Sequence, residues 1–236
     1  MDVPALILAG GQGTRLRGVM ANRPKVLAPI GGRPFLSYLF DQLENAGVSR
    51  VVLCTGHLAE QIEETFGPRY GRLALSYSRE QQPLGTGGAL RQALGMVVGD
   101  LLMVLNGDSY TACPLAAFLT WHRRHCFPGS LVLTWVEDAS RFGTIEVGAG
   151  DAIASFHEKQ GLPRPGWINA GIHLLSRKLI EALPVGKPVS LEREAFPDWM
   201  ASGLGGYALR APFLDIGTPD SLARAETFLA ELHAAQ

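Results

Sequence analysis

The chain has 236 residues, of which 47% are hydrophobic and 18% are charged, a composition typical of a folded globular protein. Its formal net charge of −1 excludes a global basic field that would attract nucleic acid or an anionic membrane surface. Three cysteines without a C-x-x-C pair disfavour a disulfide framework and predict a reducing, cytoplasmic compartment. No apolar run approaches the roughly 20 residues of a membrane span, and the run at residues 5–9 is too short for a signal peptide.

The first half of the sequence alternates strand patterns with helix patterns. A buried strand is predicted at residues 5–9, where the apolar run stops at Gly10 and Gly11. Further strands are predicted at residues 51–54, 73–77 and 101–105, and helices at residues 35–46, 58–66, 89–97 and 115–125. Because strands that alternate with helices form right-handed βαβ units, we expect a Rossmann-like α/β fold with an open, mostly parallel sheet flanked by helices.

The second half has strand patterns that follow one another, which predicts that the sheet becomes mixed. Strands are expected at residues 131–136, 144–147, 152–156, 172–175, 207–210 and 213–215, and helices at residues 178–183, 191–200 and 219–235. No linker or internal repeat separates this half from the first. We therefore expect a single domain over residues 1–236, in which residues 129–236 extend the sheet of residues 1–128.

A glycine-rich turn follows the first strand directly, with the sequence Gly10-Gly11-Gln12-Gly13-Thr14-Arg15. Glycines let the backbone turn tightly and approach phosphate oxygens, and Arg15 can add charge-assisted bonds to a triphosphate. The turn lacks the last glycine of the dinucleotide fingerprint, because Leu16 stands there, and Val19 stands where a Walker lysine is needed. By itself the turn is equally well explained as a structural connection between a strand and a helix.

Aspartates stand at the ends of two predicted strands. Asp108 closes the run Asn106-Gly107-Asp108 after the strand at 101–105, and Asp215 ends the strand at 213–215. Ligands of open α/β sheets bind beyond the carboxyl ends of the strands. Mg²⁺ takes one or two protein carboxylates and completes its shell with phosphates and water, so the two aspartates are candidate ligands. Either aspartate alone could instead be a helix cap or a turn residue.

The order of the motifs is more specific than any one of them. The run G-G-x-G-T-R-L from Gly10 is followed by Pro24-Lys25 and then by G-x-P-x-L from Gly32. This order resembles the signature of the nucleotidyl-transferring sugar pyrophosphorylases. The later runs P-L-G-T-G-G-A and F-L-D-I-G-T-P make the D-glycero-D-manno-heptose 1-phosphate guanylyltransferases the most similar members. The resemblance covers residues 5–225.

The resemblance implies a fold of the nucleotide-diphospho-sugar transferase type and a reaction. In that reaction a nucleoside monophosphate passes from a nucleoside triphosphate, here GTP, to a sugar 1-phosphate, here the heptose phosphate, and pyrophosphate leaves. Residues 1–128 would form the nucleotide-binding half and residues 129–236 the sugar-phosphate-binding half. No nucleic-acid or membrane partner is implied, and the oligomeric state is not readable from the sequence.

The resemblance also implies roles for individual residues in nucleotide binding and catalysis. Arg15 and Lys25 would grip the triphosphate, and together with Asp108 they would be the catalytic residues. The nucleotide would further contact Gly10, Gly11, Gly13 and Thr14 in the turn, and Gln82 and the backbone near Gly87 around the base. The run at 82–88 could otherwise be only a turn before a helix. Asp108 and Asp215 would hold Mg²⁺.

In the second half, the resemblance implies that the sugar phosphate contacts the backbone near Gly143 and Gly171. The side chains of Glu158 and Asn169 would meet sugar hydroxyls, and Lys159 would neutralise the phosphate of the sugar. This division suits the chemistry, since carboxylates and amides bind hydroxyls and a lysine binds a phosphate. Glu158 and Lys159 could otherwise form a surface ion pair.

Two other functions stay open at this point. One is a uridylyl-, thymidylyl- or cytidylyltransferase that acts on a hexose or amino-sugar 1-phosphate, because the Gln82 amide has both donors and acceptors and does not fix the base. The other is a non-catalytic regulatory homologue that binds sugar nucleotides, against which the full set of charged motif residues argues. His122, His125 and Cys126 could also hold a transition metal, although no fourth ligand is apparent.

Overall fold

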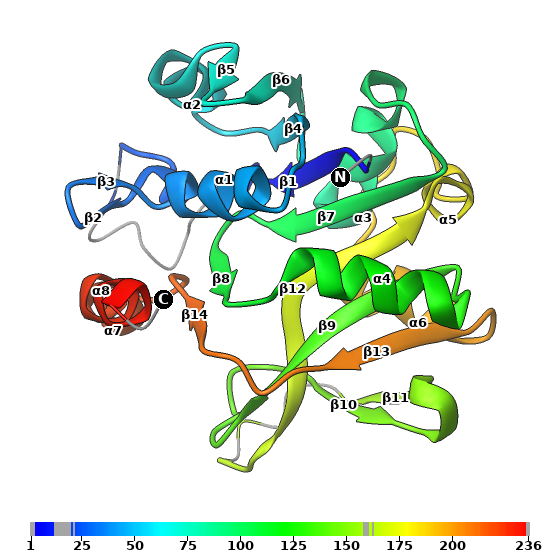
Figure 1. The fold of residues 1–236 in the computed structure, drawn as a ribbon. Coiled ribbons are helices and arrows are strands. Elements are labelled where there is room, and N and C mark those ends of the chain that lie inside the picture. The colour runs from blue at the N-terminus through cyan, green and yellow to red at the C-terminus, as the bar shows by residue number, and fades with distance from the viewer. Residues whose placement is uncertain (1–2, 12–19, 21, 158–160, 162, 235–236) are drawn as a thin grey trace.

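The structure is a computed structural model that describes residues 3–11, 20, 22–157, 161 and 163–234 (Figure 1). Its central feature is a ten-stranded sheet with the order β11-β10-β12-β7-β1-β4-β6-β5, and β9 and β13 continue it from β12. Strands of this sheet in the first half are β1 (Ala5–Leu8), β4 (Arg50–Thr55), β5 (Arg69–Tyr70), β6 (Leu73–Arg79) and β7 (Leu101–Asn106). Strands in the second half are β9 (Gly129–Val136), β10 (Thr144–Val147), β11 (Ile153–His157), β12 (Gly166–Ser176) and β13 (Leu204–Ala208).

The sheet is parallel at its centre and mixed beyond β7, where β13 pairs with β9 in parallel and the other pairs are antiparallel, as the two halves of the sequence predict. The strands β7, β1, β4 and β6 pair in parallel, whereas β12 runs antiparallel to β7, β9 and β10. Two short two-stranded ribbons lie outside this sheet. They are β2 (Pro29–Ile30) with β3 (Arg33–Pro34), and β8 (Ser109–Thr111) with β14 (Phe213–Asp215). The expected mixed, mostly parallel α/β fold is therefore confirmed.

Helices cover both faces of the sheet, since the strands are apolar on both sides. The helices are α1 (Leu36–Asn45), α2 (Ala59–Phe66), α3 (Gly85–Ala93), α4 (Leu115–His125), α5 (Arg177–Glu181), α6 (Phe196–Met200), α7 (Pro219–Ala223) and α8 (Ala225–Ala234). Short helical turns are η2 (Lys25–Leu27), η3 (Leu94–Met96), η4 (Ala149–Asp151) and η5 (Leu191–Ala195), of which η5 is a π-helical turn. None of the helices in the described ranges is long and apolar enough to cross a membrane.

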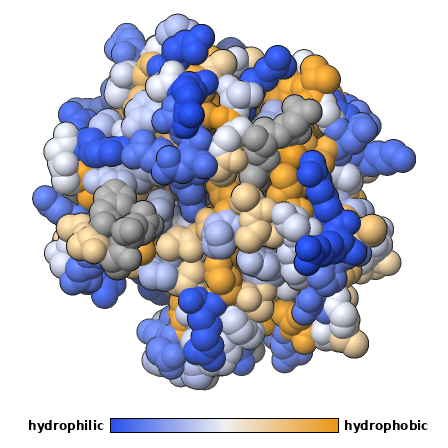
Figure 2. Space-filling view, in the orientation of Figure 1, coloured by the Kyte–Doolittle hydropathy of each residue, from blue (hydrophilic) through white to orange (hydrophobic). Residues whose placement is uncertain are grey.

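Alternate strand residues point into two hydrophobic cores. Ile7 and Leu105 pack in one core with residues of α1, α4 and α8, whereas Leu6 and Val104 pack in the other with residues of α3, α5 and α6. Burying each such side chain contributes about 1.5–3 kcal/mol, so the sheet is held from both sides. Figure 2 shows hydrophilic residues spread over the face in view, with hydrophobic residues in separate patches between them.

This topology brings distant parts of the sequence to one edge of the sheet. The carboxyl ends of β1, β4, β6 and β7 lie on the same edge because these strands are parallel. The antiparallel strand β12 pairs Ile172 with Leu105, so its first half extends past the end of β7. The ribbon of β8 and β14 sets Asp215 opposite Ser109. The direction of strand addition also reverses at this edge, because β4 and β6 lie on one side of β1 and β7 lies on the other. Open α/β sheets bind ligands at such a switch point.

Candidate active site

Two cavities open at the carboxyl edge of the parallel strands. The smaller, which we call the loop cavity, has a volume of about 380 Å³, and its lining includes Gly10, Gly11, Lys25, Glu80, Gly85 and Thr86. The larger, which we call the extension cavity, has a volume of about 610 Å³, and its lining includes Gly143, Asn169, Ser190, Arg193, Phe213 and Asp215. Asn106, Asp108 and Glu192 line both cavities. The two cavities therefore meet at the end of β7.

An ion pair between Lys25 and Asp108 stands at this meeting point. The Lys25 Nζ donates to Asp108 Oδ2, across 83 residues of sequence. The Lys25 side chain is 14% exposed and that of Asp108 is 39% exposed, so the ammonium is the more buried partner. The preceding residue must be a glycine, because a Cβ on Gly107 would lie 2.7 Å from the Leu8 carbonyl oxygen. The chain that carries Asp108 can therefore pass close to the end of β1. A largely buried cation thus faces the loop cavity and binds the aspartate that both cavities share.

Asp215 reaches the same place from the far end of the chain. Ile216 donates its backbone N–H to the Asp108 carbonyl oxygen at 3.0 Å, which joins the two aspartate-bearing segments. The carboxylate of Asp215 accepts from the Gly217 N–H at 2.6 Å and from Arg141 Nη2 at 2.7 Å. Each aspartate therefore has one cationic partner, and both line the extension cavity.

The two carboxylates fit a magnesium ion by the chemistry of their donors. Hard oxygen ligands suit Mg²⁺, and two carboxylates suffice when substrate phosphates and water complete its shell. Within the described ranges no group of three or more His, Cys, Asp or Glu side chains is placed to hold a metal by itself. His122 instead pairs with Ser130 at 2.8 Å, and His125 with the Trp121 carbonyl oxygen and Asp151. The two aspartates therefore fit a Mg²⁺ site in which substrate phosphates and water supply the remaining ligands.

Asn169 is fixed as a hydrogen-bond donor toward the extension cavity. Its Oδ1 accepts from the Gly171 N–H and from His173 Nε2, both at 2.9 Å. These two bonds occupy the oxygen, so the amide Nδ2 remains to donate. Since Oδ1 only accepts, His173 carries its proton on Nε2, and no described residue bonds to its buried Nδ1. Burial lowers the pKa of His173 to about 3, so its imidazole is neutral.

The neutral His173 predicts a pH dependence of folding. Its pKa is lowered in the native state, so between about pH 6.5 and pH 3 the unfolded chain binds a proton that the native chain does not. The stabilisation is complete above pH 6.5 and falls as the pH decreases, by about 1.4 kcal/mol per pH unit for one group. The free energy of unfolding, measured with urea at pH 7, 6 and 5, should fall less steeply with decreasing pH in His173→Gln than in wild type. The exposed His57→Gln should keep the wild-type slope, and equal slopes for all three proteins contradict the assignment.

Gly143 lines the extension cavity, whereas Gly171 is buried behind Asn106 and Ser109, which line it. Gly171 has φ +76°, and a Cβ there would lie 2.5 Å from Ser109 Oγ. A Cβ on Gly143 would lie 2.9 Å from the His157 carbonyl oxygen. Both positions therefore need glycine, and of the two only the backbone at Gly143 lines the cavity.

The segment before α3 is divided between the loop cavity and the interior. Gly85 and Thr86 line the cavity, whereas Gly87 is buried and donates its N–H to the Val189 carbonyl oxygen at 2.8 Å. Gln82 is exposed and is not among the residues that line the cavity. Thr86 Oγ1 also accepts from the Leu191 N–H at 2.7 Å, which ties this segment to η5.

Several residues expected in the site lie outside the described residues. They are Gly13, Thr14, Arg15, Glu158 and Lys159. Those that are described and line a cavity are Gly10, Gly11, Lys25, Asp108, Gly143, Asn169 and Asp215. The structure thus gathers at one edge seven positions that the sequence scatters over more than 200 residues.

Four charged residues of the site had not been expected from the sequence. They are Glu80, Arg141, Glu192 and Arg193, each of which lines a cavity or binds an aspartate. Glu80 directly follows β6, so the rule of strand carboxyl ends could have found it. Arg141 lies in a connection that no periodic pattern marks, whereas Glu192 and Arg193 lie in η5, inside the helix expected at residues 191–200, where the pattern did not indicate a role in the site.

A parallel sheet with a glycine turn, a lysine and two aspartates at its carboxyl edge is typical of enzymes that act on nucleotide phosphates. The chain belongs to the nucleotidyl transferase family, whose model matches residues 4–231.

Three proteins illustrate this relationship. The mannose-1-phosphate guanylyltransferase of Mycobacterium tuberculosis is 36% identical over 94% of this chain, which spans 63% of that protein's length. The D-glycero-alpha-D-manno-heptose 1-phosphate guanylyltransferase of Aneurinibacillus thermoaerophilus is 34% identical over 94% of this chain and 96% of that protein. The structure of HddC from Yersinia pseudotuberculosis complexed with GMP-PN has a TM-score of 0.84 and 31% identity, and covers 96% of this chain and 99% of that one.

Proposed function

We propose that this chain transfers GMP from GTP to a sugar 1-phosphate, giving a GDP-sugar and pyrophosphate. The observation that carries the proposal is the pair of cavities that share Asp108, beside the Lys25 ammonium. One cavity follows the glycine turn and suits a nucleotide, and the other suits a second substrate that approaches the same phosphates. A binding-only homologue has no need of an ion pair placed between two ligand cavities. The guanylyltransferases among its relatives favour GTP.

The division of labour between the halves follows from the cavities. Residues 1–128 would hold the nucleotide in the loop cavity, and residues 129–236 would supply most of the extension cavity for the sugar phosphate. Glu192 crosses this division, because it lines both cavities. Asn169 Nδ2 would donate to a sugar hydroxyl, and the backbone at Gly143 and Gly171 would approach the sugar closely.

The reaction needs no side-chain nucleophile. A phosphate oxygen of the sugar 1-phosphate attacks the α-phosphorus of GTP in line, the bond to the β-phosphate oxygen breaks, and pyrophosphate leaves with the electron pair. Catalysis then rests on positioning and on stabilising negative charge. Lys25 is placed to neutralise charge on the phosphates, and we assign Arg15 the same task from the family signature.

Asp108 and Asp215 would hold a magnesium ion when the substrates are present. A bound Mg²⁺ supplies charge neutralisation at the reacting phosphates. Lys25 and Arg141, which bind the two carboxylates without it, keep both side chains in a fixed position. Binding of the ion would free these two cations to face the substrate phosphates.

The sugar is proposed to be a D-glycero-D-manno-heptose 1-phosphate. The match with the heptose enzyme of A. thermoaerophilus runs over 94% of this chain and 96% of that protein. Mannose 1-phosphate is the second candidate, because the M. tuberculosis mannose enzyme has the higher identity, 36%, although it is longer. The two sugars share the manno configuration, so the extension cavity would recognise the same arrangement of hydroxyl groups in both cases.

A substrate grid tests the proposal. GTP, UTP, dTTP, CTP and ATP are each combined with heptose, mannose, glucose and N-acetylglucosamine 1-phosphates, with pyrophosphate release as the readout. We expect kcat/KM for GTP to exceed that for the other nucleotides on the order of 10²-fold or more, since a missing polar contact is costly. The heptose phosphate should exceed mannose phosphate. No pyrophosphate from any combination contradicts the enzyme assignment, and a best rate with UTP or dTTP contradicts the guanylyl assignment alone.

A further inference from the structure

A further cavity, which we call the outer cavity, adjoins the active site behind Asp215. It has a volume of about 600 Å³, and its lining comes from the connection after β9, from β14 and from α7 and α8. Phe142, Phe213 and Asp215 line both the outer cavity and the extension cavity, so these three side chains form a wall between the two. Arg141 lines the outer cavity, and its Nη2 donates to Asp215 in this wall at 2.7 Å.

The backbone on both sides of this ion pair is held in place. Ala139 is buried, and its N–H donates to the Arg164 carbonyl oxygen at 2.8 Å. The Phe142 N–H donates to the Ala139 carbonyl oxygen at 2.9 Å, and the Phe142 ring packs edge-on against Phe213 with the ring centroids 5.6 Å apart. A change of partner by Arg141 therefore needs only a rotation of its side chain.

Arg141 occupies a carboxylate that the proposed metal site needs. Asp215 Oδ1 accepts from the Gly217 N–H at 2.6 Å, and Oδ2 accepts from Arg141. The side chain of Asp215 is 16% exposed and that of Arg141 is 39% exposed. A guanidinium on a carboxylate oxygen repels a second cation on the same carboxylate, the more so where little water screens them. Arg141 and Mg²⁺ therefore compete for Asp215.

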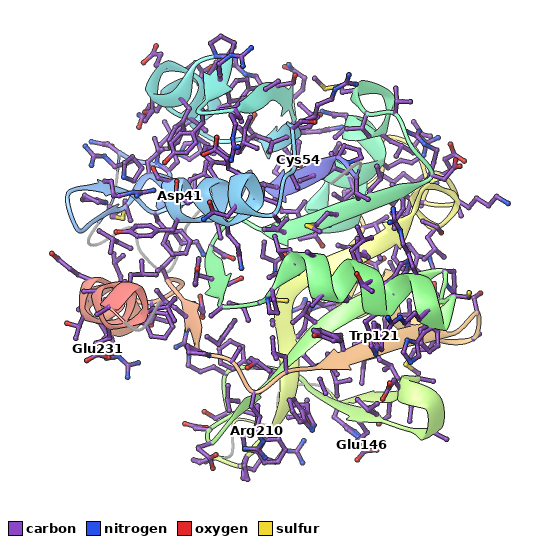
Figure 3. All side chains as sticks on the ribbon, viewed as in Figure 1. Asp41, Cys54, Trp121, Glu146, Arg210 and Glu231 are labelled. Carbon is purple, nitrogen blue, oxygen red and sulfur yellow. The ribbon has the colours of Figure 1, made fainter. Side chains whose placement is uncertain are left out.

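The pairing of Arg141 with Asp215 is selective, because two other carboxylates line the outer cavity. They belong to Asp138 and to Glu231, which Figure 3 labels on α8. Asp138 Oδ1 accepts from the Ser140 N–H at 2.9 Å. Among the described residues, the ion pair of Arg141 is made with Asp215 and with neither of these two. The guanidinium thus binds the carboxylate that also faces the extension cavity.

We propose that Arg141 couples the binding of Mg²⁺ to the binding of the sugar 1-phosphate by exchanging Asp215 for the phosphate. This inference rests on the proposed nucleotidyl transfer and names the residue that links its metal to its second substrate. A phosphate is a bidentate partner for a guanidinium, as a carboxylate is. The sugar phosphate would enter the cavity that Asp215 lines. Once Arg141 binds the phosphate, Asp215 is available to the ion, and by reciprocity the ion raises the affinity for the sugar 1-phosphate equally.

A double-mutant cycle in a chelating buffer tests the exchange without metal or turnover. Titration calorimetry measures the affinity for D-glycero-D-manno-heptose and mannose 1-phosphates. Asp215→Asn deprives Arg141 of its carboxylate, so we expect the affinity to rise at least about tenfold, the scale of one bond between charged groups. The same substitution in an Arg141→Gln background should give at most a small part of that rise. An equal rise in both backgrounds would show that the lost negative charge alone attracts the phosphate, and this result, or no rise in either, overturns the proposal.

The metal requirement of turnover supplies a second readout. Arg141→Gln removes the competitor for Asp215, so the variant should reach half its maximal rate of pyrophosphate release at a lower Mg²⁺ concentration than wild type. Its KM for the sugar 1-phosphate should rise, whereas its KM for GTP should change little, since Arg141 is not among the residues that line the loop cavity. Arg224→Gln changes an exposed arginine of the same outer cavity and should keep the wild-type values. An unchanged or higher Mg²⁺ requirement in Arg141→Gln contradicts the competition.

The outcomes separate this inference from the proposed function. If wild type releases pyrophosphate but Asp215→Asn gains no affinity that depends on Arg141, the exchange is wrong and the enzyme assignment stands. If wild type releases none from any pair of substrates, the enzyme assignment is wrong. The calorimetric cycle still decides whether Arg141 exchanges Asp215 for a phosphate in that case, because it needs no turnover.

Discussion

Asp108→Asn is expected to lose at least about 10²–10³-fold in turnover, while its affinity for GTP without metal stays equal or rises. The reason is the ion pair between Asp108 and Lys25, whose side chain is 14% exposed. The substitution removes a carboxylate that would hold Mg²⁺ and at the same time releases Lys25 to bind the triphosphate. Pyrophosphate release with Mg²⁺ measures the turnover, and calorimetric titration of GTP in a chelating buffer measures the affinity.

Asp215→Asn is the informative comparison. It should also lose turnover, but its metal-free affinity for GTP should not change, because its cationic partner is Arg141 at 2.7 Å rather than Lys25. Asp220→Asn makes the same chemical change at an exposed position of α7 and should keep full activity. Near-normal turnover in either site variant, with Mg²⁺ as the only metal, removes that aspartate from the metal site. Weaker metal-free GTP binding in Asp108→Asn contradicts the role of the ion pair.

Much of the fold was predictable because its central strands are apolar on both faces. The apolar runs at β1, β4 and β7 need no long-range information, since each is short, continuous and bounded by polar or glycine residues, and β6 is marked by its alternation of buried and exposed residues. The strand β12 was expected only at residues 172–175, whereas it runs from Gly166 to Ser176. Its first half contains Asn169 and Gly171 and passes through an irregular register, so no alternation marks it. The positive φ of Gly171 that permits this path is invisible in a sequence pattern.

The elements that the sequence did not predict have similar physical reasons. The strand β8 has three residues and is a strand only because β14 pairs with it from far along the chain. The helix expected at residues 191–200 is divided into the π-helical turn η5 and α6. Pro197 lies in the first turn of α6, where its missing N–H breaks no helical bond. Sequence periodicity cannot locate such a division.

The residues of the candidate site that stand at the ends of strands could be predicted from the sequence. Asp108 and Asp215 were expected as partners of one ion from their places after strands, and the ribbon of β8 and β14 does bring them together. The binding of Lys25 to Asp108 was not predictable, because it depends on how the turn η2 lies against the end of β7. Glu192 joins both cavities through a contact of η5 with Thr86, 106 residues away, which only the tertiary structure reveals.

Lys25→Ala is expected to lose roughly 10²–10³-fold in kcat/KM for GTP, the scale of a lost charge-stabilising donor. Two effects act in the same direction. The triphosphate loses the buried ammonium, and Asp108 loses the partner that neutralises it in the metal-free protein. Because the phosphates gain charge as pyrophosphate leaves, turnover should fall as well as GTP affinity. The KM for the sugar 1-phosphate should change little, since Lys25 lines the loop cavity and not the extension cavity.

Steady-state kinetics with each substrate varied in turn measure these constants for Lys25→Ala and for Lys159→Ala. Lys159 lies outside the described residues, and the family signature assigns it to the phosphate of the sugar, so Lys159→Ala should mainly raise the KM for sugar 1-phosphate. Lys178→Ala changes an exposed lysine on α5 and should match wild type in both KM values. The double variant Lys25→Ala with Asp108→Asn should bind metal-free GTP better than Lys25→Ala alone, because the unpaired carboxylate is gone. The same kinetic pattern in Lys25→Ala and Lys159→Ala is the result that contradicts separate phosphate sites.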